Sequence, residues 1–149
     1  GGVRTPLPLA AAEHRAGIGY TAHFATLWIP DARDAAAWLA EAAPPDRLAL
    51  LREAGAQVGR MHRAGVAHPD LNLRNLLVTG GEGISPIVHL LDFDRARVSP
   101  GPVSPRRRAA DLRRLARSVR KLGAPVGPGG WAAFREGYGA GWPPRLDLG

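Results

Sequence analysis

The polar residues of two short segments could do chemistry together. The first segment, "AHPDLNLRN", holds His68, Asp70 and Asn75, and the second, "LLDFDR", holds Asp92 and Asp94. Carboxylate and amide oxygens are ligands that Mg²⁺ prefers, and a separate carboxylate can orient a hydroxyl group and accept its proton. Asn75 and Asp92 are therefore candidate magnesium ligands, and Asp70 is a candidate base. Taken singly, each would more often be a turn residue or a cap.

The hydrophobic pattern around these segments predicts a strand pair that would position them. Short apolar runs at 75–79 and 87–91 are separated by the Gly-rich stretch "GGEGISP", which is typical of two strands joined by a turn. Such a pair would bring Asn75 and Asp92 to one end of the strands. Asp70 would lie beside them, in the turn between the preceding helix and the first strand.

The rest of the pattern predicts a hairpin and four helices. Residues 5–30 read as two strands joined at "RAGIG", the second from Tyr20 to Ile29. The helix before the polar segment would begin with Asp46 as its N-cap and end at Gly65. Its buried stripe is predicted to be Leu48, Leu51, Ala54, Val58 and Met61. The other helices are predicted at 34–42, 105–122 and 131–138.

Composition limits the class of protein. With 149 residues, 45% of them hydrophobic and 22% charged, the chain can bury one sizeable core. No apolar run approaches the roughly 20 residues of a membrane span, and no signal peptide pattern is present. The absence of cysteine excludes disulfides and thiolate metal sites, which fits a cytoplasmic protein.

The basic residues gather on one face of the helix predicted at 105–122. The formal net charge is +7, and Lys121 is the only lysine. A solvated face is the commoner explanation of such a run. If the face is functional, it suits an anionic membrane surface or lipid phosphates better than nucleic acid, because no helix-turn-helix or RNA-binding pattern accompanies it. The basic residues are Arg106, Arg107, Arg108, Arg113, Arg114, Arg117, Arg120 and Lys121, and the candidates for lipid contacts are Arg113, Arg117 and Arg120.

The order of the polar residues resembles the catalytic and metal-binding motifs of protein kinases, H-R-D-x-x-x-x-N followed by D-F-G. Here the motifs read His68-Pro69-Asp70 through Asn75, then Asp92-Phe93-Asp94. The residues of both segments resemble the lipopolysaccharide kinase family, and so does the downstream stretch "DLRRLARSVRKL". Within that family the resemblance is greatest to the kinases of 3-deoxy-D-manno-octulosonic acid (Kdo). The resemblance covers residues 60–122 most clearly and extends to residue 17.

The resemblance implies an α+β, protein-kinase-like fold, mostly the helical C-terminal lobe with the last strands of the N-terminal lobe. It implies ATP-dependent, Mg²⁺-dependent phosphorylation of the 4-hydroxyl of Kdo in Kdo-lipid IVA, by a peripheral protein on the cytoplasmic side of the inner membrane. In this scheme Asp70 is the base, Asn75 and Asp92 bind magnesium, and His68 braces the loop. The hinge that meets adenine would be Leu27, Trp28 and Ile29, which places the small lobe and hinge at 1–30 and the large lobe at 31–149.

The sequence departs from the kinase pattern at several positions. Asp94 replaces the glycine of D-F-G, and Asn72, a supporting residue of the catalytic loop, stands where protein kinases often have a lysine. With Lys121 far downstream, the lysine of the small lobe and the phosphate-binding loop are both missing. We therefore expect the 149 residues to be a fragment that binds ATP poorly and is inactive alone.

Two other functions remain open from the sequence. A small-molecule phosphotransferase of the aminoglycoside type would use the same Asp, Asn and Asp arrangement. A non-catalytic kinase-like or basic binding module would be favoured if no further lobe accompanied these residues. The "DFDR" stretch favours the lipopolysaccharide kinase resemblance over both.

Overall fold

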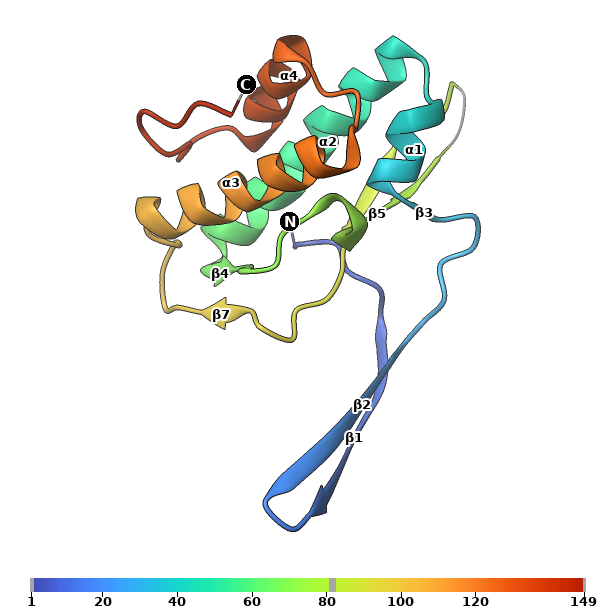
Figure 1. The fold of residues 1–149 in the computed structure, drawn as a ribbon, viewed down its shortest axis with the longest axis vertical. Helices are drawn as coiled ribbons and strands as arrows, with labels where there is room; N and C mark the ends of the chain where they lie inside the picture. The colour runs from blue at the N-terminus through green and yellow to red at the C-terminus, as the bar shows by residue number, and fades with distance from the viewer. Residues whose placement is uncertain (1, 81–82, 149) are drawn as a thin grey trace.

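The computed structural model describes residues 2–80 and 83–148, so part of the predicted Gly-rich turn, residues 81–82, lies outside the described residues. The elements follow the predicted order along the chain (Figure 1). They are β1 (Pro8–Ala16), β2 (Gly19–Thr26), β3 (Arg33–Asp34), α1 (Ala35–Glu41), α2 (Pro44–Arg63), β4 (Val66–Ala67), the 3₁₀ turn η1 (Leu73–Asn75), β5 (Leu76–Thr79), β6 (Ile87–Leu90), β7 (Arg97–Val98), α3 (Pro105–Leu122) and α4 (Pro128–Tyr138). None of the described helices is long and apolar enough to cross a membrane.

The first two strands form a hairpin that projects from the helical body (Figure 1). β1 and β2 pair antiparallel from Pro8↔Thr26 to Ala16↔Gly19, and every residue of both strands is exposed. The second strand ends at Thr26, three residues before the predicted Ile29. Close to the body, the chain before β1 is fixed by Arg4, whose N–H donates to Gln57 Oε1 at 3.0 Å and whose carbonyl accepts from Leu90 N–H at 2.9 Å.

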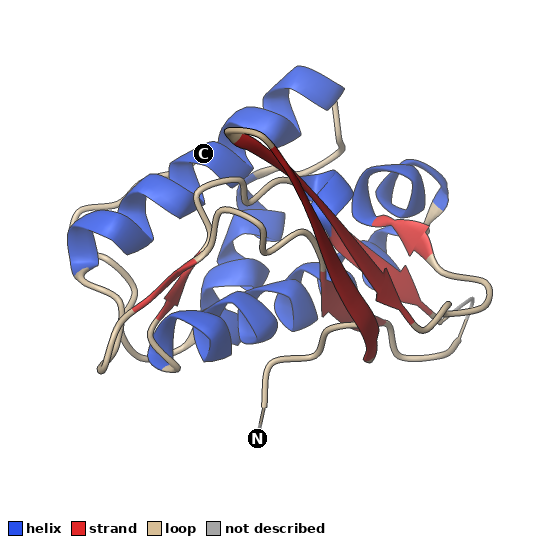
Figure 2. Cartoon of the chain, turned by 90° about the horizontal axis from the view of Figure 1, so that it is seen from below, coloured by secondary structure: helices blue, strands red, loops and turns tan. Residues whose placement is uncertain are grey.

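Short strands support the polar segments. β3, β5 and β6 form an antiparallel sheet in that order, with Leu76 opposite Leu90. The predicted pairing of the runs at 75–79 and 87–91 is therefore confirmed. β4 and β7 form a separate two-stranded ladder, which Figure 2 shows set apart from the other strands.

The four helices enclose the hydrophobic core, and α2 and α4 approach each other at backbone distance. A Cβ atom added at Gly55 of α2 would lie 2.0 Å from the carbonyl oxygen of Phe134, and one added at Gly137 of α4 would lie 1.8 Å from that of Arg52. Both glycines are therefore required by close contact, because any side chain would overlap the facing helix.

Two details of α2 differ from the prediction. The helix begins at Pro44 after Ala43 as N-cap, so Asp46 lies in its first turn and is not the cap. Leu48 is 40% exposed, whereas Leu50 is 1% exposed. Proline is well suited to the first helical position because it has no N–H to satisfy there. The other predicted members of the buried stripe, from Leu51 to Met61, are buried.

Candidate functional site

His68 ties the loop that follows β4 to two other parts of the fold. Its backbone N–H donates to Asp111 Oδ2 at 2.8 Å, and its ring Nε2 donates to the carbonyl of Leu91 at 2.9 Å. The ring also stacks at a tilt on Phe93, with centroids 5.2 Å apart. Because Leu91 and Phe93 flank Asp92, His68 connects the Asp70 loop to the segment that carries Asp92.

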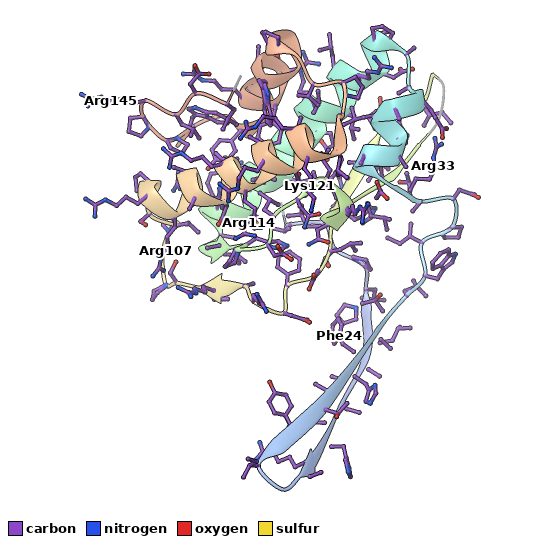
Figure 3. The ribbon with its side chains drawn as sticks, viewed as in Figure 1. Phe24, Arg33, Arg107, Arg114, Lys121 and Arg145 are labelled. Carbon is purple, nitrogen blue, oxygen red and sulfur yellow. The ribbon has the colours of Figure 1, made fainter. Side chains whose placement is uncertain are left out.

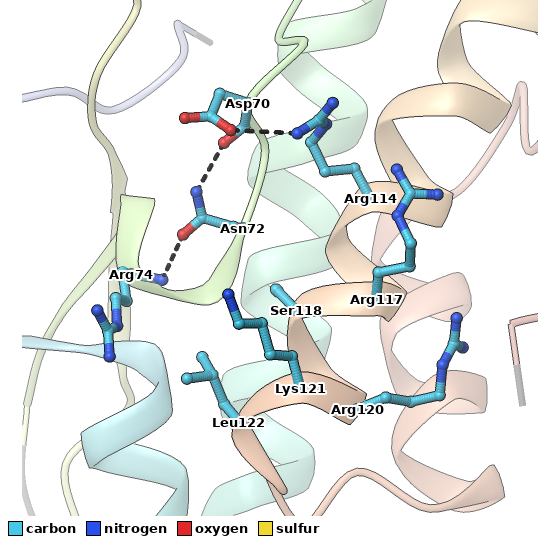
Figure 4. A pocket seen from close by; sticks show the side chains of 9 residues that line it. All are labelled: Asp70, Asn72, Arg74, Arg114, Arg117, Ser118, Arg120, Lys121 and Leu122. Carbon is cyan, nitrogen blue, oxygen red and sulfur yellow. Dashed lines mark hydrogen bonds and ion pairs between the residues drawn. The ribbon is translucent and has the colours of Figure 1, made fainter.

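Asn72 and Asn75 hold the same loop from within. Both side-chain amides donate to the carbonyl oxygen of Asp70, at 2.9 and 3.0 Å. The Asn72 Oδ1 atom accepts from the N–H groups of Arg74 and Asn75, so it caps η1 (Figure 4). The Asp70 backbone is fixed by these bonds, while its carboxylate remains 46% exposed.

Asp92 lies two residues after the end of β6, at the same end of the strand pair as Asn75. Leu91 N–H donates to the carbonyl of Asn75 at 2.9 Å, and this bond joins the two predicted metal ligands through the backbone. Asp92 has φ of 60°, a left-handed conformation that few non-glycine residues adopt. Such strain is often found where a side chain is aimed at a ligand.

The carboxylates of Asp70 and Asp92 line different cavities. Asp92 and Asp94 line a cavity of about 510 Å³ whose far wall is the hairpin, with Phe24 and Thr26. Asp70 lines a second cavity of about 630 Å³ with Asn72 and residues of α3. Asp92 therefore lies on the hairpin side and Asp70 on the α3 side, Asn75 lines neither of these two cavities, and the meeting of all three residues in one cleft stays a prediction.

The donor atoms near Asp92 suit a hard cation. In residues 2–80 and 83–148, no cluster of three or more His, Cys, Asp or Glu side chains could hold a metal. The predicted pair is of a different kind, one carboxylate and one amide oxygen. The amide nitrogen of Asn75 donates to the carbonyl of Asp70, which leaves Oδ1 of Asn75 as an acceptor. Asp92 makes no ion pair within the described part of the chain. These oxygens fit Mg²⁺ bound together with phosphate oxygens.

A buried polar network beneath the loop was not predicted from the sequence. Asp111 of α3 is 5% exposed and accepts from His68 N–H and from His62 Nε2, the latter at 3.3 Å. The other His62 ring nitrogen, Nδ1, lies 2.8 Å from the Tyr138 hydroxyl. Asp111 is the only carboxylate on α3 and falls on its apolar face, between Ala109 and Leu112. That position was the signal that could have identified it.

Burial shifts the pKa of both outer members of this network. It lowers the pKa of His62, against the opposing effect of the hydrogen bond and charge of Asp111. It raises the pKa of the Tyr138 hydroxyl, against the charge of Arg108. A neutral His62 can donate from Nε2 to Asp111 while Nδ1 accepts from the Tyr138 hydroxyl, so all three groups are satisfied.

The basic side chains of α3 lie in three kinds of surroundings: a group lines the cavity beside Asp70, Arg113 is exposed, and Arg108 is buried. Arg114 lies 3.4 Å from Asp70 Oδ1, and with Arg117, Arg120 and Lys121 it lines the cavity beside Asp70. Figure 3 shows Arg114 and Lys121 on the side of α3 toward the loop. Arg113 is exposed and does not line this cavity.

Arg108 does not belong to the solvated face, so its predicted placement there is wrong. Its side chain is buried because the guanidinium donates to the carbonyls of Val103 at 2.6 Å and Gly141 at 2.7 Å. These carbonyls belong to the loop before α3 and to the tail after α4. Arg108 therefore joins those two segments.

The predicted hinge follows the hairpin. Leu27 and Trp28 are exposed, Trp28 at 79%, and Ile29 is half-buried. Leu27 N–H donates to the carbonyl of Leu7 at 2.8 Å, continuing the hairpin by one bond. The role of the three residues toward adenine stays a prediction.

Comparison with known proteins agrees with these features. The model of the lipopolysaccharide kinase (Kdo/WaaP) family matches residues 1–138. A 3-deoxy-D-manno-octulosonic acid kinase of Vibrio cholerae is 35% identical over 120 residues, which are 80% of this chain and 47% of that protein. The corresponding kinase of Xanthomonas oryzae is 40% identical over 118 residues, 78% of this chain and 43% of that protein. The chain thus spans less than half the length of these relatives.

A solved structure of WaaP in complex with acyl carrier protein superposes with a TM-score of 0.73, at 22% identity, over 98% of this chain and 61% of that one. The predicted α+β, protein-kinase-like fold is confirmed by this likeness. The matched family model, the Kdo kinases among the relatives and the shared fold lead to one conclusion: the chain belongs to the lipopolysaccharide kinase (Kdo/WaaP) family.

Proposed function

We propose that this protein phosphorylates Kdo with ATP, at the 4-hydroxyl of Kdo-lipid IVA, during synthesis of the lipopolysaccharide core. The proposal is supported by the relatives named as Kdo kinases. The observation that carries it is the chain of bonds from Asp70 through Asn75 to Leu91, which couples a candidate base to a candidate metal ligand.

Asp70 would orient the acceptor hydroxyl and accept its proton. Its backbone is held by the two asparagine amides, so the carboxylate starts from a fixed point, and its side chain is open to a cavity large enough for a sugar. Positioning of this kind supplies much of the rate of phosphoryl transfer, because little covalent chemistry is required of the protein.

Asn75 and Asp92 would hold magnesium against the phosphates of ATP. The ion, when bound, neutralises charge on the transferred phosphoryl group and its leaving group. Asp92 faces the cavity between the body and the hairpin, where nucleotide would lie. His68 would keep this segment in register with the Asp70 loop through its bond to Leu91.

The substrate lipid places the reaction at a membrane surface. We propose peripheral association with the anionic cytoplasmic face of the inner membrane, supported by the excess of basic side chains on α3 and the net charge of +7. Arg113 is exposed on that helix and is a candidate for contact with lipid headgroups.

The test is transfer of labelled phosphate to Kdo-lipid IVA by the protein expressed from its complete reading frame. Asp70→Asn should lower kcat by about 10²–10⁴-fold with little change in ATP binding, because the base acts on the acceptor. Asp92→Asn should weaken both Mg-ATP binding and transfer, because the phosphates lose a metal ligand.

Glu136→Gln is the matched control for both variants. It removes one carboxylate from a surface ion pair with Arg52, far from the Asp70 loop in sequence. Turnover of Asp70→Asn equal to that of the control would eliminate the proposed base. Transfer to aminoglycosides and never to Kdo-lipid would instead make the protein a phosphotransferase of that type.

A further inference from the structure

The cavity beside Asp70 has an unusual concentration of positive charge. Five of its nine lining residues are basic, and Asp70 is its only carboxylate. The basic residues are Arg74, Arg114, Arg117, Arg120 and Lys121. Side chains of like charge repel each other when they share a cavity, so this arrangement is most stable with a bound anion.

The helix α3 builds one wall of this cavity by its periodicity. Three, four and seven residues after Arg114 come Arg117, Ser118 and Lys121. This spacing places all four side chains on one side of the helix. Figure 4 shows Arg114 and Lys121 reaching from this wall toward the loop that carries Asp70 and Asn72. Two of the positive charges, those of Arg114 and Lys121, are therefore directed at the position where the acceptor hydroxyl would meet Asp70.

Most of these cations have no ion-pair partner within residues 2–80 and 83–148. Among the described residues, Arg117, Arg120 and Lys121 form no ion pair. Arg114 pairs only with Asp70, at 3.4 Å, and both side chains are nearly half exposed. An ion pair this long and this exposed is weak, so a competing anion can take Arg114 from Asp70.

We propose that this cavity binds an acidic group of the sugar acceptor, a carboxylate or a phosphate, chiefly through Lys121, Arg117 and Arg114. The proposal rests on the proposed function, because Asp70 is taken as the group that meets the acceptor. Guanidinium groups bind two anion oxygens at once, and the lysine ammonium adds a point charge. The relatives are named as kinases of a sugar acid. An acceptor of this class therefore carries a carboxylate on the sugar that is phosphorylated.

The acidic group would also prepare Asp70 for its role. In this structure Asp70 Oδ1 faces Arg114. When the acceptor's anion binds Arg114, this oxygen is released to accept the hydroxyl hydrogen of the same acceptor. A neutral or cationic sugar would leave the Arg114 to Asp70 pair intact, and an aminoglycoside, with several ammonium groups, would be repelled by the cavity wall.

The experiment compares Lys121→Gln and Arg117→Gln with Arg106→Gln, a change at an exposed arginine in the first turn of α3, in the protein from the complete reading frame. All three remove one positive charge from α3, but only the first two alter the cavity. We expect each cavity variant to raise KM for Kdo-lipid IVA about tenfold or more, the effect of one charge-assisted hydrogen bond, with KM for ATP unchanged. Arg106→Gln should change KM for the lipid less than about twofold.

Modified acceptors identify the anion. If the sugar carboxylate is bound, its methyl ester should be a poor acceptor for the wild type, and Lys121→Gln should cause no further loss with it. If a lipid phosphate is bound, the dephosphorylated lipid should be the poor acceptor for the wild type, and Lys121→Gln should cause no further loss with it. Equal KM increases in all three variants that vanish at high salt would overturn the proposal in favour of attraction to the membrane surface. Unchanged KM in both cavity variants would also overturn it.

A binding measurement separates this proposal from the proposed function. If the sugar carboxylate is the bound anion, ligand-observed NMR should detect free Kdo on the wild type and on Arg106→Gln, weaker binding on Lys121→Gln, and no binding of the Kdo methyl ester on the wild type. If this pattern appears and no phosphate is transferred to any Kdo acceptor, the proposed function fails and the anion site stands. If phosphate is transferred but Lys121→Gln binds Kdo as the wild type does and has an unchanged KM for Kdo-lipid IVA, the anion site fails alone.

Discussion

Replacing Asp111 by alanine should destabilise the protein severely, because this carboxylate is the shared acceptor of the network under the Asp70 loop. Removing it leaves the buried His68 N–H without a partner and removes the acceptor for the fully buried His62 ring. Loss of one partner from a buried, charged hydrogen-bonded pair costs about 3–5 kcal/mol. Because single domains have roughly 5–15 kcal/mol of stability in total, this loss is a large fraction of it.

Asp111→Asn should be milder, at about 1–2 kcal/mol. Both contacts of Asp111 are made by Oδ2, so an asparagine with its amide oxygen at that position can still accept from His68 N–H and from His62 Nε2, and only the negative charge is lost. The difference between alanine and asparagine therefore measures the value of an acceptor at this position, and the difference between asparagine and the wild type measures the value of its charge.

Urea unfolding followed by tryptophan fluorescence is the assay, since Trp38 is buried and Trp131 and Trp142 pack against the core. With a slope of roughly 2 kcal/mol per molar urea, the alanine variant should unfold at about 1.5–2.5 M lower urea than the wild type. Glu136→Gln, on the surface, should shift the midpoint by less than about 0.3 M. A shift of that small size for Asp111→Ala, with an unchanged slope, would refute the role given to the network.

Two further predictions concern pH and helix packing. Stability should fall as the pH is lowered from about 7.5 through 6.5, because the unfolded chain takes up a proton at His62 near its ordinary pKa of 6.5 while burial lowers the pKa of His62 in the folded protein. Burial also lowers the pKa of His89, so His62→Gln should reduce this pH dependence without abolishing it. If the urea midpoint of the variant falls with pH as steeply as that of the wild type, the assignment of the dependence to His62 is contradicted. Gly55→Ala should lower the melting temperature by the equivalent of about 1–3 kcal/mol, because its Cβ would lie 2.0 Å from a carbonyl oxygen. Gly129→Ala, at an uncrowded position on α4, should leave stability unchanged or raise it by about 0.5–1 kcal/mol. Equal melting temperatures of the two variants in calorimetric scans would show that the helices can separate without cost.

The sequence allowed good prediction where local signals and tertiary packing agree. The bounds of α3 match the predicted 105–122 because Pro105 suits the first turn and Gly123 takes the left-handed conformation, φ 61°, that ends the helix. The strand pair was predictable because alternating runs and a Gly-rich turn specify both strands and their pairing. The strand pair places Asn75 and Asp92 at one of its ends, and α3 carries the basic residues beside Asp70.

The parts that could not be predicted depend on partners remote in sequence. Arg108 resembles its neighbours on the basic face, and its burial is made favourable by the carbonyls of Val103 and of Gly141, the second of which is 33 residues away. His62 has no local sequence signal for its role, because its partners Asp111 and Tyr138 lie 49 and 76 residues away. Residues such as these are determined by the packing of helices, and the polar pattern of one helix does not contain that information.

The contact between α2 and α4 has a consequence for motion. Where two helix backbones touch, at Gly55 and Gly137, no side chain lies between them that could change rotamer and let one helix slide past the other. The pair should therefore move as one rigid body, carrying His62 and Tyr138 with it. The exposed hairpin is joined to this body only through residues 3–7 and 27–32 (Figure 1). Opening and closing of the cavity between Phe24 and Asp92 would then be a swing of the hairpin about these two segments, while the Asp70 loop stays still.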